Sequence, residues 1–222
     1  TEIYRGTRSL VYRARQTNPE LPVVIKILRA DQPEPQQMVA VRREFEIGRS
    51  LAIPGVIQTY SLREDGSLIL EDFGGASLKQ FIAHGVPIRI FLEVAIRVAE
   101  ALAHLHEKQV IHKDLKPANI IVNSDFSVVK LADFSIASLQ TRESSELTSP
   151  NMLEGTMAYM SPEQTGRMNR GLDSRSDLYS LGVTFYELLT GELPFQISDP
   201  SELLHCHLTR VPTPPHERKA GV

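Results

Sequence analysis

The sequence predicts an α+β protein with two lobes: a small β-rich N-terminal lobe that carries one helix, and a larger, mainly helical C-terminal lobe. Residues 1–72 contain short β-branched runs, the longest at 23–28, which are typical of buried strands. From Ile88 onward, apolar residues recur at the spacing of a helix face. Between these regions Gly74 and Gly75 interrupt the apolar alternation, as a hinge would. We therefore expect an N-lobe at 1–72 and a C-lobe at 73–222.

The composition is that of an ordinary globular protein: 222 residues, of which 41% are hydrophobic and 23% charged. A net charge of −3 provides no basic field, which argues against nucleic acid as a partner. The single cysteine, Cys206, excludes an internal disulfide and fits a reducing compartment, so we expect a cytoplasmic protein. No apolar run approaches the roughly 20 residues of a membrane helix, and we expect no membrane insertion. Because the chain begins with Thr1, we expect further domains of the same polypeptide as partners.

In the small lobe the third predicted strand contains one lysine, Lys26. Burying a lysine is costly unless its charge is paired, so this residue is a candidate for function. The other strands are expected at residues 3–4 and 10–14, and as a hairpin of residues 56–62 and 67–70.

A helix is expected from Gln36 to Leu51, after two prolines that break the chain. It carries Glu44 eighteen positions after Lys26, far enough for the helix to fold back on the strand. Glu46 is the alternative partner for the lysine. We prefer Glu44 because Ile47 and Leu51 then share its helix face toward the sheet. Two surface carboxylates with no role are the remaining possibility.

The large lobe is expected to contain two long helices and a short one. The first has an apolar stripe, which we expect to face the core. Its members are Ile88, Phe91, Leu92, Ala95, Ile96, Ala99, Leu102 and Leu105. The second covers Asp177–Leu189 and is apolar nearly all round, with Ser176 as its expected N-cap and Gly191 at its end. The short helix is expected at Ser201–Leu208.

A polar run at residues 112–119, His-Lys-Asp-Leu-Lys-Pro-Ala-Asn, lies between two apolar segments. Its carboxylate (Asp114), ammonium (Lys116) and carboxamide (Asn119) are the groups that phosphoryl transfer requires: one orients a hydroxyl, one steadies a phosphate and one binds a hard metal ion. Asp133 follows a short predicted strand 19 residues after Asp114 and could supply a second oxygen ligand. Ordinary polar turns remain the alternative at both places.

The polar run resembles the catalytic loop of protein kinases, His-Arg-Asp-Leu-Lys-x-x-Asn, with Lys113 in the arginine position. Asp133-Phe134-Ser135 resembles the Asp-Phe-Gly motif, and Ser161-Pro162-Glu163 resembles Ala-Pro-Glu. The chain is thus identified as a member of the protein kinase superfamily. It is similar to bacterial Ser/Thr kinase domains of the eukaryotic type that are fused to large sensor and ATPase proteins. The implied fold is the bilobal protein kinase fold over residues 1–222, with its final helices absent.

The resemblance implies a role for each motif residue. Lys26, held by Glu44, would bind the α- and β-phosphates of ATP, while Asn119 and Asp133 bind Mg²⁺. Asp114 would orient the hydroxyl of a protein substrate, and Lys116 would stabilise the γ-phosphate. The nucleotide would be covered by the loop around Gly6 and enclosed by Val11, Val24, Leu70, Ile121 and the hinge backbone at Glu71 and Phe73. Thr156 stands where Ser/Thr-directed kinases carry a threonine, and Asp177 would bind the catalytic-loop backbone.

Three residues depart from the family pattern. Tyr4 and Ser9 replace glycines of the phosphate-covering loop, and Ser135 replaces a glycine that would tolerate a backbone flip. These departures favour the alternative, a pseudokinase that binds nucleotide or serves as a scaffold. The four polar residues Lys26, Asp114, Asn119 and Asp133 favour an active kinase. A small-molecule kinase of the aminoglycoside phosphotransferase type shares the loop but lacks the Ser-Pro-Glu motif.

The polar segment at residues 138–154 resembles an activation segment. Its hydroxyl groups are candidate phosphorylation sites, with Lys113 as the expected cationic partner, although an exposed loop without a regulatory role is the alternative. These residues are Thr141, Ser144, Ser145, Thr148 and Ser149. In the family Glu163 pairs with an arginine of the final helices, and we expect it to have no such partner here.

Overall fold

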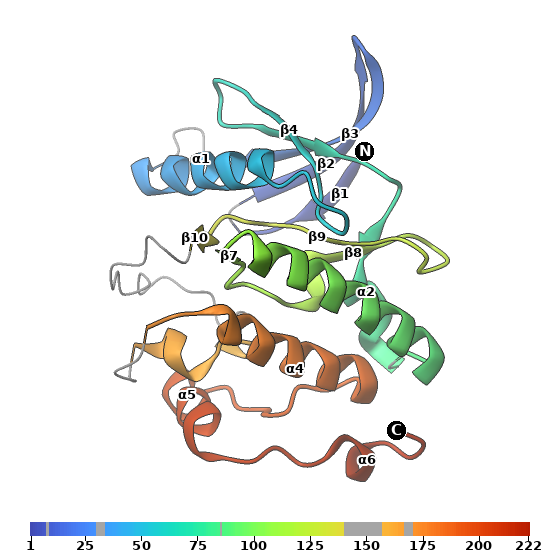
Figure 1. The fold of residues 1–222 in the computed structure, drawn as a ribbon, viewed down its shortest axis with the longest axis vertical. Coiled ribbons are helices and arrows are strands. Elements are labelled where there is room, and N and C mark those ends of the chain that lie inside the picture. The colour runs from blue at the N-terminus through green and yellow to red at the C-terminus, as the bar shows by residue number, and fades with distance from the viewer. Residues whose placement is uncertain (8, 30–33, 85, 140–156, 167–170) are drawn as a thin grey trace.

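The computed structural model describes residues 1–7, 9–29, 34–84, 86–139, 157–166 and 171–222. It confirms the predicted α+β architecture, with a β-rich N-terminal lobe above a mainly helical C-terminal lobe (Figure 1). The small lobe is an antiparallel five-stranded sheet of order β1-β2-β3-β5-β4, with one helix packed on it. Its elements are β1 (Glu2–Arg5), β2 (Ser9–Thr17), β3 (Glu20–Leu28), α1 (Pro35–Ser50), β4 (Thr59–Leu62) and β5 (Leu68–Glu71).

The third strand lies in the middle of this sheet. Lys26 is opposite Val11 of β2 on one side and opposite Leu68 of β5 on the other. The strand is therefore held on both edges, which gives the lysine a rigid origin.

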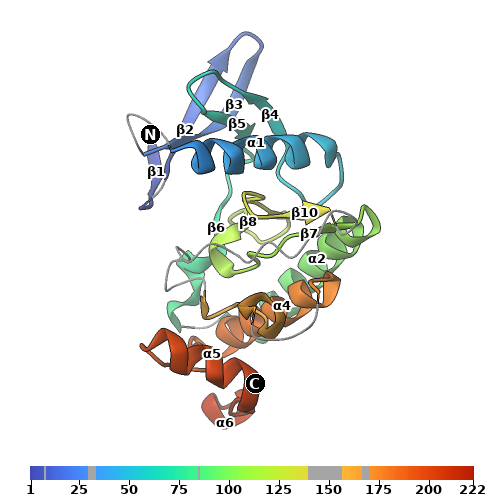
Figure 2. The ribbon, with the colours of Figure 1, turned by 90° about the vertical axis from the view of Figure 1, so that its left-hand side faces the viewer.

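Residues 56 and 57 do not belong to the hairpin that the sequence predicts, because β4 begins only at Thr59. Instead they bind the large lobe: the Ile57 amide donates to the Leu131 carbonyl at 2.9 Å, and the Leu131 amide donates to the Gly55 carbonyl at 2.7 Å. Val56 is completely buried there. The loop between α1 and β4 thus joins the lobes at a second place besides the hinge (Figure 2). An apolar pair buries equally well against either lobe, so the sequence pattern could not separate the two.

In its described residues the large lobe combines short strands under the cleft with three α-helices and a final single helical turn. The strands form two small sheets, β6-β8-β9 and β10-β7. They are β6 (Ala76–Ser77), β7 (Val110–Ile111), β8 (Ile120–Val122), β9 (Val129–Leu131) and β10 (Ser138–Leu139). The helices are α2 (Ile88–Glu107), α4 (Ser174–Thr190), α5 (Pro200–Thr209) and α6 (Pro215–Arg218), with 3₁₀ turns at Leu78–His84, Pro117–Asn119 and Pro162–Thr165.

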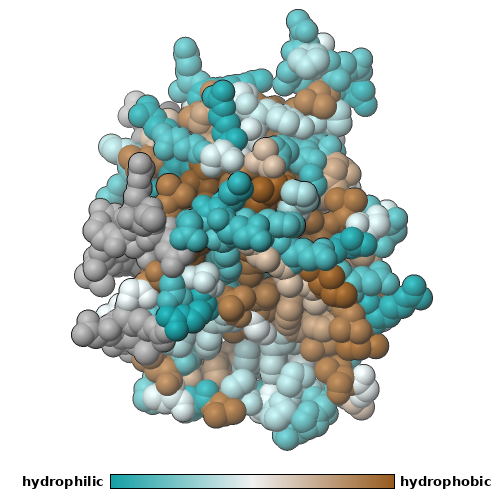
Figure 3. All heavy atoms as spheres, viewed as in Figure 1, coloured by the Kyte–Doolittle hydropathy of each residue, from teal (hydrophilic) through white to brown (hydrophobic). Residues whose placement is uncertain are grey.

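The core-facing stripe of helix α2 agrees only in part with the one the sequence predicts: Phe91, Leu102 and Leu105 are buried as expected. Its buried residues are Phe91, Val94, Val98, Ala101, Leu102 and Leu105. Ile88, Leu92 and Ile96 are about half exposed, and Figure 3 shows hydrophobic residues gathered over this part of the surface. Both rows of α2 are apolar, so helical periodicity could not tell which row packs inward.

The start of α4 also differs from the expectation. Asp173 is the N-cap, and its carboxylate accepts a hydrogen bond from the Arg175 amide at 2.9 Å. The expected cap, Ser176, is buried in the first turn and donates to the Glu163 carboxylate at 2.6 Å. Glu163 thereby gains a partner that the sequence did not indicate. Gly191 ends the helix at φ 83°, as predicted.

Among the described residues, no helix combines the length and apolar character needed to cross a bilayer.

Gly48 sets the distance between α1 and the sheet. A Cβ atom at Gly48 would lie 2.2 Å from Oγ1 and 3.1 Å from Cβ of Thr59 on β4. Both residues are buried, and Glu44 lies one helical turn before the glycine. The close approach of α1 therefore depends on the missing side chain.

We predict that Gly48→Ala destabilises the fold by about 1–2 kcal/mol in urea unfolding, because overpacking outweighs the gain in helix propensity. Gly182→Ala in α4 is the matched control. Its added Cβ meets no atom within 4 Å, so it should stabilise by about 0.5–1 kcal/mol. Thr59→Ala in the Gly48→Ala background should recover part of the loss. If Gly48→Ala and Gly182→Ala stabilised the fold equally, the close packing of α1 on β4 at Gly48 would be contradicted.

Candidate active site

The loop between β7 and β8 is fixed from below by one buried carboxylate. Asp177 of α4 has no exposed surface and accepts hydrogen bonds from the amides of His112 and Lys113, both at 2.8 Å. Nε2 of His106 lies 2.9 Å from the same carboxylate. The sequence analysis gave His106 no role, since nothing local links it to a residue 71 positions away. The loop backbone is thus held rigidly on α4.

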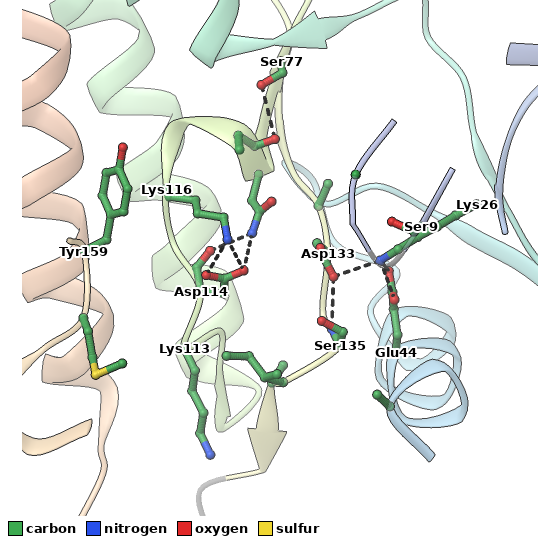
Figure 4. A pocket seen from close by; sticks show the side chains of 18 of the residues that line it. Ser9, Lys26, Glu44, Ser77, Lys113, Asp114, Lys116, Asp133, Ser135 and Tyr159 are labelled. Carbon is green, nitrogen blue, oxygen red and sulfur yellow. Dashed lines mark hydrogen bonds and ion pairs between the residues drawn. The ribbon is translucent and has the colours of Figure 1, made fainter. Parts of the chain in front are cut away.

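Three polar side chains of the loop converge at its tip. Nζ of Lys116 donates to both carboxylate oxygens of Asp114, at 2.8 and 2.7 Å. Nδ2 of Asn119 donates to the backbone carbonyl of Asp114 at 2.8 Å and to its carboxylate at 2.9 Å. Figure 4 shows Lys116 beside Asp114, with Lys113 pointing away from both. The three predicted residues therefore form one hydrogen-bonded unit that orients the Asp114 carboxylate.

A second polar cluster faces the first across the cleft (Figure 4). Nζ of Lys26 lies 2.9 and 2.8 Å from the two carboxylate oxygens of Glu44 and 2.9 Å from Oδ1 of Asp133. Glu46, the alternative partner considered for the lysine, is exposed. The side chains of Lys26 and Glu44 are only 16% and 3% exposed. Strand β3, helix α1 and the segment after β9 thus meet at one ammonium group.

The charges of this cluster depend on one another. Burial disfavours the charged form of Lys26, but Asp133 and Glu44 outweigh it and raise the pKa of the ammonium above its ordinary value. Burial likewise disfavours ionised Asp133, but the nearby Lys26 keeps the pKa of that carboxyl well below its ordinary range. Burial raises the pKa of Glu44 to about 7, against the opposing effect of Lys26. Asp133 is therefore the firmly ionised carboxylate, and Glu44 titrates near neutral pH.

The segment Asp133-Phe134-Ser135 is strained at a different residue from the one expected. The positive φ belongs to Asp133, at 67°, so this conformation does not require glycine at position 135. The Ser135 amide lies 3.4 Å from Oδ1 of Asp133. Phe134 is buried, with its ring centroid 4.9 Å from that of His112. Serine is thus accommodated here, and the expected resistance to flipping stays a prediction.

One large cleft between the lobes is lined by every residue that the sequence singled out for nucleotide, metal or catalysis. These are Gly6, Val11, Val24, Lys26, Glu44, Leu70, Glu71, Phe73, Asp114, Lys116, Asn119, Ile121 and Asp133. Tyr4 lies directly over Gly6, since a Cβ there would approach the Tyr4 ring to 2.8 Å. The aromatic ring therefore covers the position where the phosphate-covering loop retains its glycine.

The hinge residue Glu71 is engaged by both its backbone and its side chain. Its amide donates to the Gln58 carbonyl at 2.9 Å, and its carboxylate accepts from the Gln58 amide at 3.1 Å. The carboxylate also forms an ion pair with Lys130 of β9. The Glu71 side chain is thus structural, and any contact with a ligand falls to the backbone.

Gln164 is a further residue that sequence reasoning missed. Its side-chain amide donates to the Lys113 carbonyl at 2.9 Å, while its oxygen accepts from the Ser161 amide and hydroxyl at 3.0 Å. The Ser-Pro-Glu motif is thereby connected to the catalytic-type loop. The candidate phosphorylation sites and Thr156 lie outside the described residues.

The oxygen ligands present fit a hard cation that is shared with a phosphate ligand. Within the described parts of the chain, no three His, Cys, Asp or Glu side chains form a complete metal site. Asp133 offers an ionised carboxylate, and the hydrogen bonds of Asn119 given above come from its nitrogen, which leaves its oxygen for a metal. One carboxylate and one amide, completed by phosphate and water, suit Mg²⁺.

Comparison with known proteins agrees with this geometry. Residues 1–217 match the family model of the protein kinase domain. The serine/threonine-protein kinase PknB of Mycolicibacterium smegmatis is 34% identical over 98% of this chain and 36% of its own length. The serine/threonine-protein kinase pkn3 of Myxococcus xanthus is 36% identical over 98% of this chain and 42% of its own length. The chain thus spans less than half the length of these relatives.

We predict that Asp177→Ala destabilises the fold by about 2–5 kcal/mol in urea unfolding, because two buried amides and His106 lose their acceptor. Hydrogen exchange at His112 and Lys113 should accelerate with it. Asp173→Ala, which removes the N-cap of the same helix, should cost only about 1 kcal/mol. If Asp177→Ala lowered the free energy of unfolding no more than Asp173→Ala does, Asp177 would not be the residue that holds the loop backbone.

Proposed function

The chain belongs to the protein kinase family, and on that premise we propose that it is an ATP-dependent Ser/Thr protein kinase domain in bacterial signal transduction. Relatives named as serine/threonine-protein kinases support this reaction. Because those relatives are more than twice as long as the chain, we also propose that it works with further domains of its polypeptide. The lone, buried Cys206 is compatible with the reducing environment of the cytoplasm, where we place it.

The observation that carries the proposal is the meeting of two polar clusters in one cleft. Lys26, Glu44 and Asp133 come from both lobes, and Asp114, Lys116 and Asn119 come from one loop. A structural scaffold has no need to bury an ammonium between two carboxylates on the wall of an open cleft, because such a group is costly to desolvate. Phosphoryl transfer needs these groups for positioning and for stabilising charge.

The proposed role of the small lobe is to bind ATP. Val11, Val24, Leu70 and Ile121 provide apolar walls for the base, and backbone groups of Glu71 and Phe73 provide its polar edge. Glu44 holds Lys26 so that the ammonium faces the α- and β-phosphates. Gly6 permits the loop backbone to approach the phosphates.

The proposed role of the large lobe is to align the acceptor with the transferred phosphoryl group. Asp114 accepts a hydrogen bond from the substrate hydroxyl and aims it, while Lys116 beside it stabilises charge on the γ-phosphate. Asp114 does not need a raised pKa, because in a loose transition state the hydroxyl loses its proton late. Asn119 and Asp133 would hold Mg²⁺, which when bound neutralises charge on the phosphates.

We predict that Asp114→Asn lowers turnover at least about 10²-fold, because the hydroxyl is no longer aimed by an anionic acceptor. Transfer of radiolabelled γ-phosphate from ATP·Mg²⁺ to a protein acceptor measures it, while Asp133→Ala should abolish transfer by removing a metal ligand. Asp125→Asn, in the exposed turn between β8 and β9, is the control and should leave transfer unchanged.

Near wild-type transfer by Asp114→Asn would remove the role assigned to Asp114. Nucleotide binding by the wild-type chain without any transfer would instead support a nucleotide-binding pseudokinase.

We predict that kcat/KM for ATP falls by up to about tenfold as the pH drops from about 8 to about 6. The pKa of Glu44 is raised to about 7, so the carboxyl gains a proton through this range and no longer pairs with Lys26. Because kcat/KM reports ionisations of the free enzyme, the Glu44→Gln variant tests whether the acid limb comes from this pair. Glu44→Gln should lower kcat/KM at every pH and flatten the acid limb. If the acid limb of the pH profile were unchanged in Glu44→Gln, the ionisation would belong to another group.

A further inference from the structure

The hinge carries a second carboxylate that plays no part in the chemistry proposed above. Asp72 follows Glu71, yet its side chain turns to the small lobe and is only 5% exposed. Its Oδ2 accepts a hydrogen bond from Nε of Arg13 on β2 at 2.6 Å. A nearly buried carboxylate is stable only when its charge is compensated, and Arg13 is the cation that meets it.

Arg13 contacts the hinge at two places. Besides the bond to Asp72, its Nη2 donates to the Gly75 carbonyl at 2.9 Å. The other oxygen of Asp72 accepts from the Gly74 amide at 2.8 Å. One planar guanidinium therefore joins β2 to residues 72 and 75, and the carboxylate closes the turn between them.

Within this part of the hinge, Gly75 packs against Phe73 and Ile121, but Gly74 has no such support. Gly74 has φ 77°, and its missing Cβ would meet no atom within 4 Å. Glycine has the largest conformational freedom of any residue, so two in succession make the hinge backbone costly to order. The bonds from Arg13 join Asp72, which precedes Phe73 and the glycines, to the carbonyl of Gly75, the second glycine.

Strand β2 is also the strand that carries Val11 over the crevice. Val11 and Arg13 are two positions apart, so they project from the same face of the strand. Arg13, Asp72 and Gly75 all line the cleft. The bonds from Arg13 therefore connect the covering strand to residues 72 and 75, which lie before and after Phe73, one of the two residues whose backbone is proposed to bind the base.

We propose that Arg13 is a positioning residue of the nucleotide site, acting as a clasp that holds hinge residues 72–75 against β2. The clasp orders the hinge backbone in the absence of nucleotide. It also fixes the distance between β2 and hinge residues 72–75. Its effect on nucleotide affinity rests on the function proposed above, whereas its effect on the hinge backbone does not.

The test uses three variants: Arg13→Met, Asp72→Asn, and the double variant that combines these two substitutions. Each is compared with the control Arg15→Met. Arg15 lies on the same face of β2 and pairs with Glu20, but both partners are 69% exposed, so it is a matched control. Hydrogen exchange of the hinge amides is measured without nucleotide. The dissociation constant of a fluorescent ATP analogue with Mg²⁺ and the KM for ATP are measured separately.

Arg13→Met should accelerate exchange at the Gly74 amide, which donates to Asp72, about tenfold and weaken analogue binding by a similar factor. The KM for ATP should rise while kcat stays within about twofold, since Arg13 touches no reacting group. Asp72→Asn in the Arg13→Met background should restore part of the loss, because it removes the uncompensated carboxylate. Arg13→Lys, which keeps the charge without the fork, should fall between wild type and methionine and replaces Arg13→Met if that variant does not fold.

Hinge exchange that is unchanged in Arg13→Met and Arg13→Lys would overturn the clasp, as would purely additive effects of the two single substitutions. If Arg15→Met changed hinge exchange and analogue binding as much as Arg13→Met does, the effect would come from the charge of β2 in general and not from the clasp. If wild type binds no nucleotide, the proposed function fails while the exchange measurement still decides the clasp.

Discussion

The structure depends on the burial of one ammonium group between two carboxylates. Lys26 can leave water only because Glu44 and Asp133 meet it within 3 Å, and each carboxylate comes from a different element. The central strand β3, helix α1 and the segment after β9 must therefore reach one point together. Gly48 permits this by allowing α1 to approach β4 more closely than any other residue would. An electrostatic requirement at Glu44 thus becomes a packing requirement at Gly48, one turn further along the same face of α1.

In the large lobe, hydrogen bonds hold the loop that carries Asp114, Lys116 and Asn119. A loop that holds a carboxylate, an ammonium and an amide at close quarters cannot rely on apolar packing for its shape. Asp177 supplies two backbone bonds from beneath, and Gln164 supplies a third from the neighbouring segment. Because each of these groups is buried or nearly so, every bond acts in a low-dielectric environment where its loss is costly. The loop can then present Asp114 in one orientation.

The two lobes are joined by a short hinge whose adjacent carboxylates point in opposite directions. Glu71 pairs with Lys130 of the large lobe, and Asp72 pairs with Arg13 of the small lobe. The glycines that follow would allow many relative positions of the lobes, and these ion pairs restrict them. The loop at residues 55–57 adds backbone bonds to β9. The two lobes are therefore connected at the hinge and at residues 55–57. Such a double connection fixes the walls of a cleft that would hold a charged ligand between the lobes.

Most of the architecture could be read from local patterns. The two-lobed α+β fold, the polar run at 112–119 and the end of α4 at Gly191 all followed from periodicity, residue type and turn chemistry, which act over a few positions. The docking of Val56 and the N-cap at Asp173 were predicted wrongly, and the buried face of α2 was predicted only in part, because several apolar or capping residues satisfied the same rule equally well. The partners of His106, Gln164 and Arg13 had no local signal at all. They lie 51 to 71 positions away, and only the packed chain brings such side chains within hydrogen-bond distance.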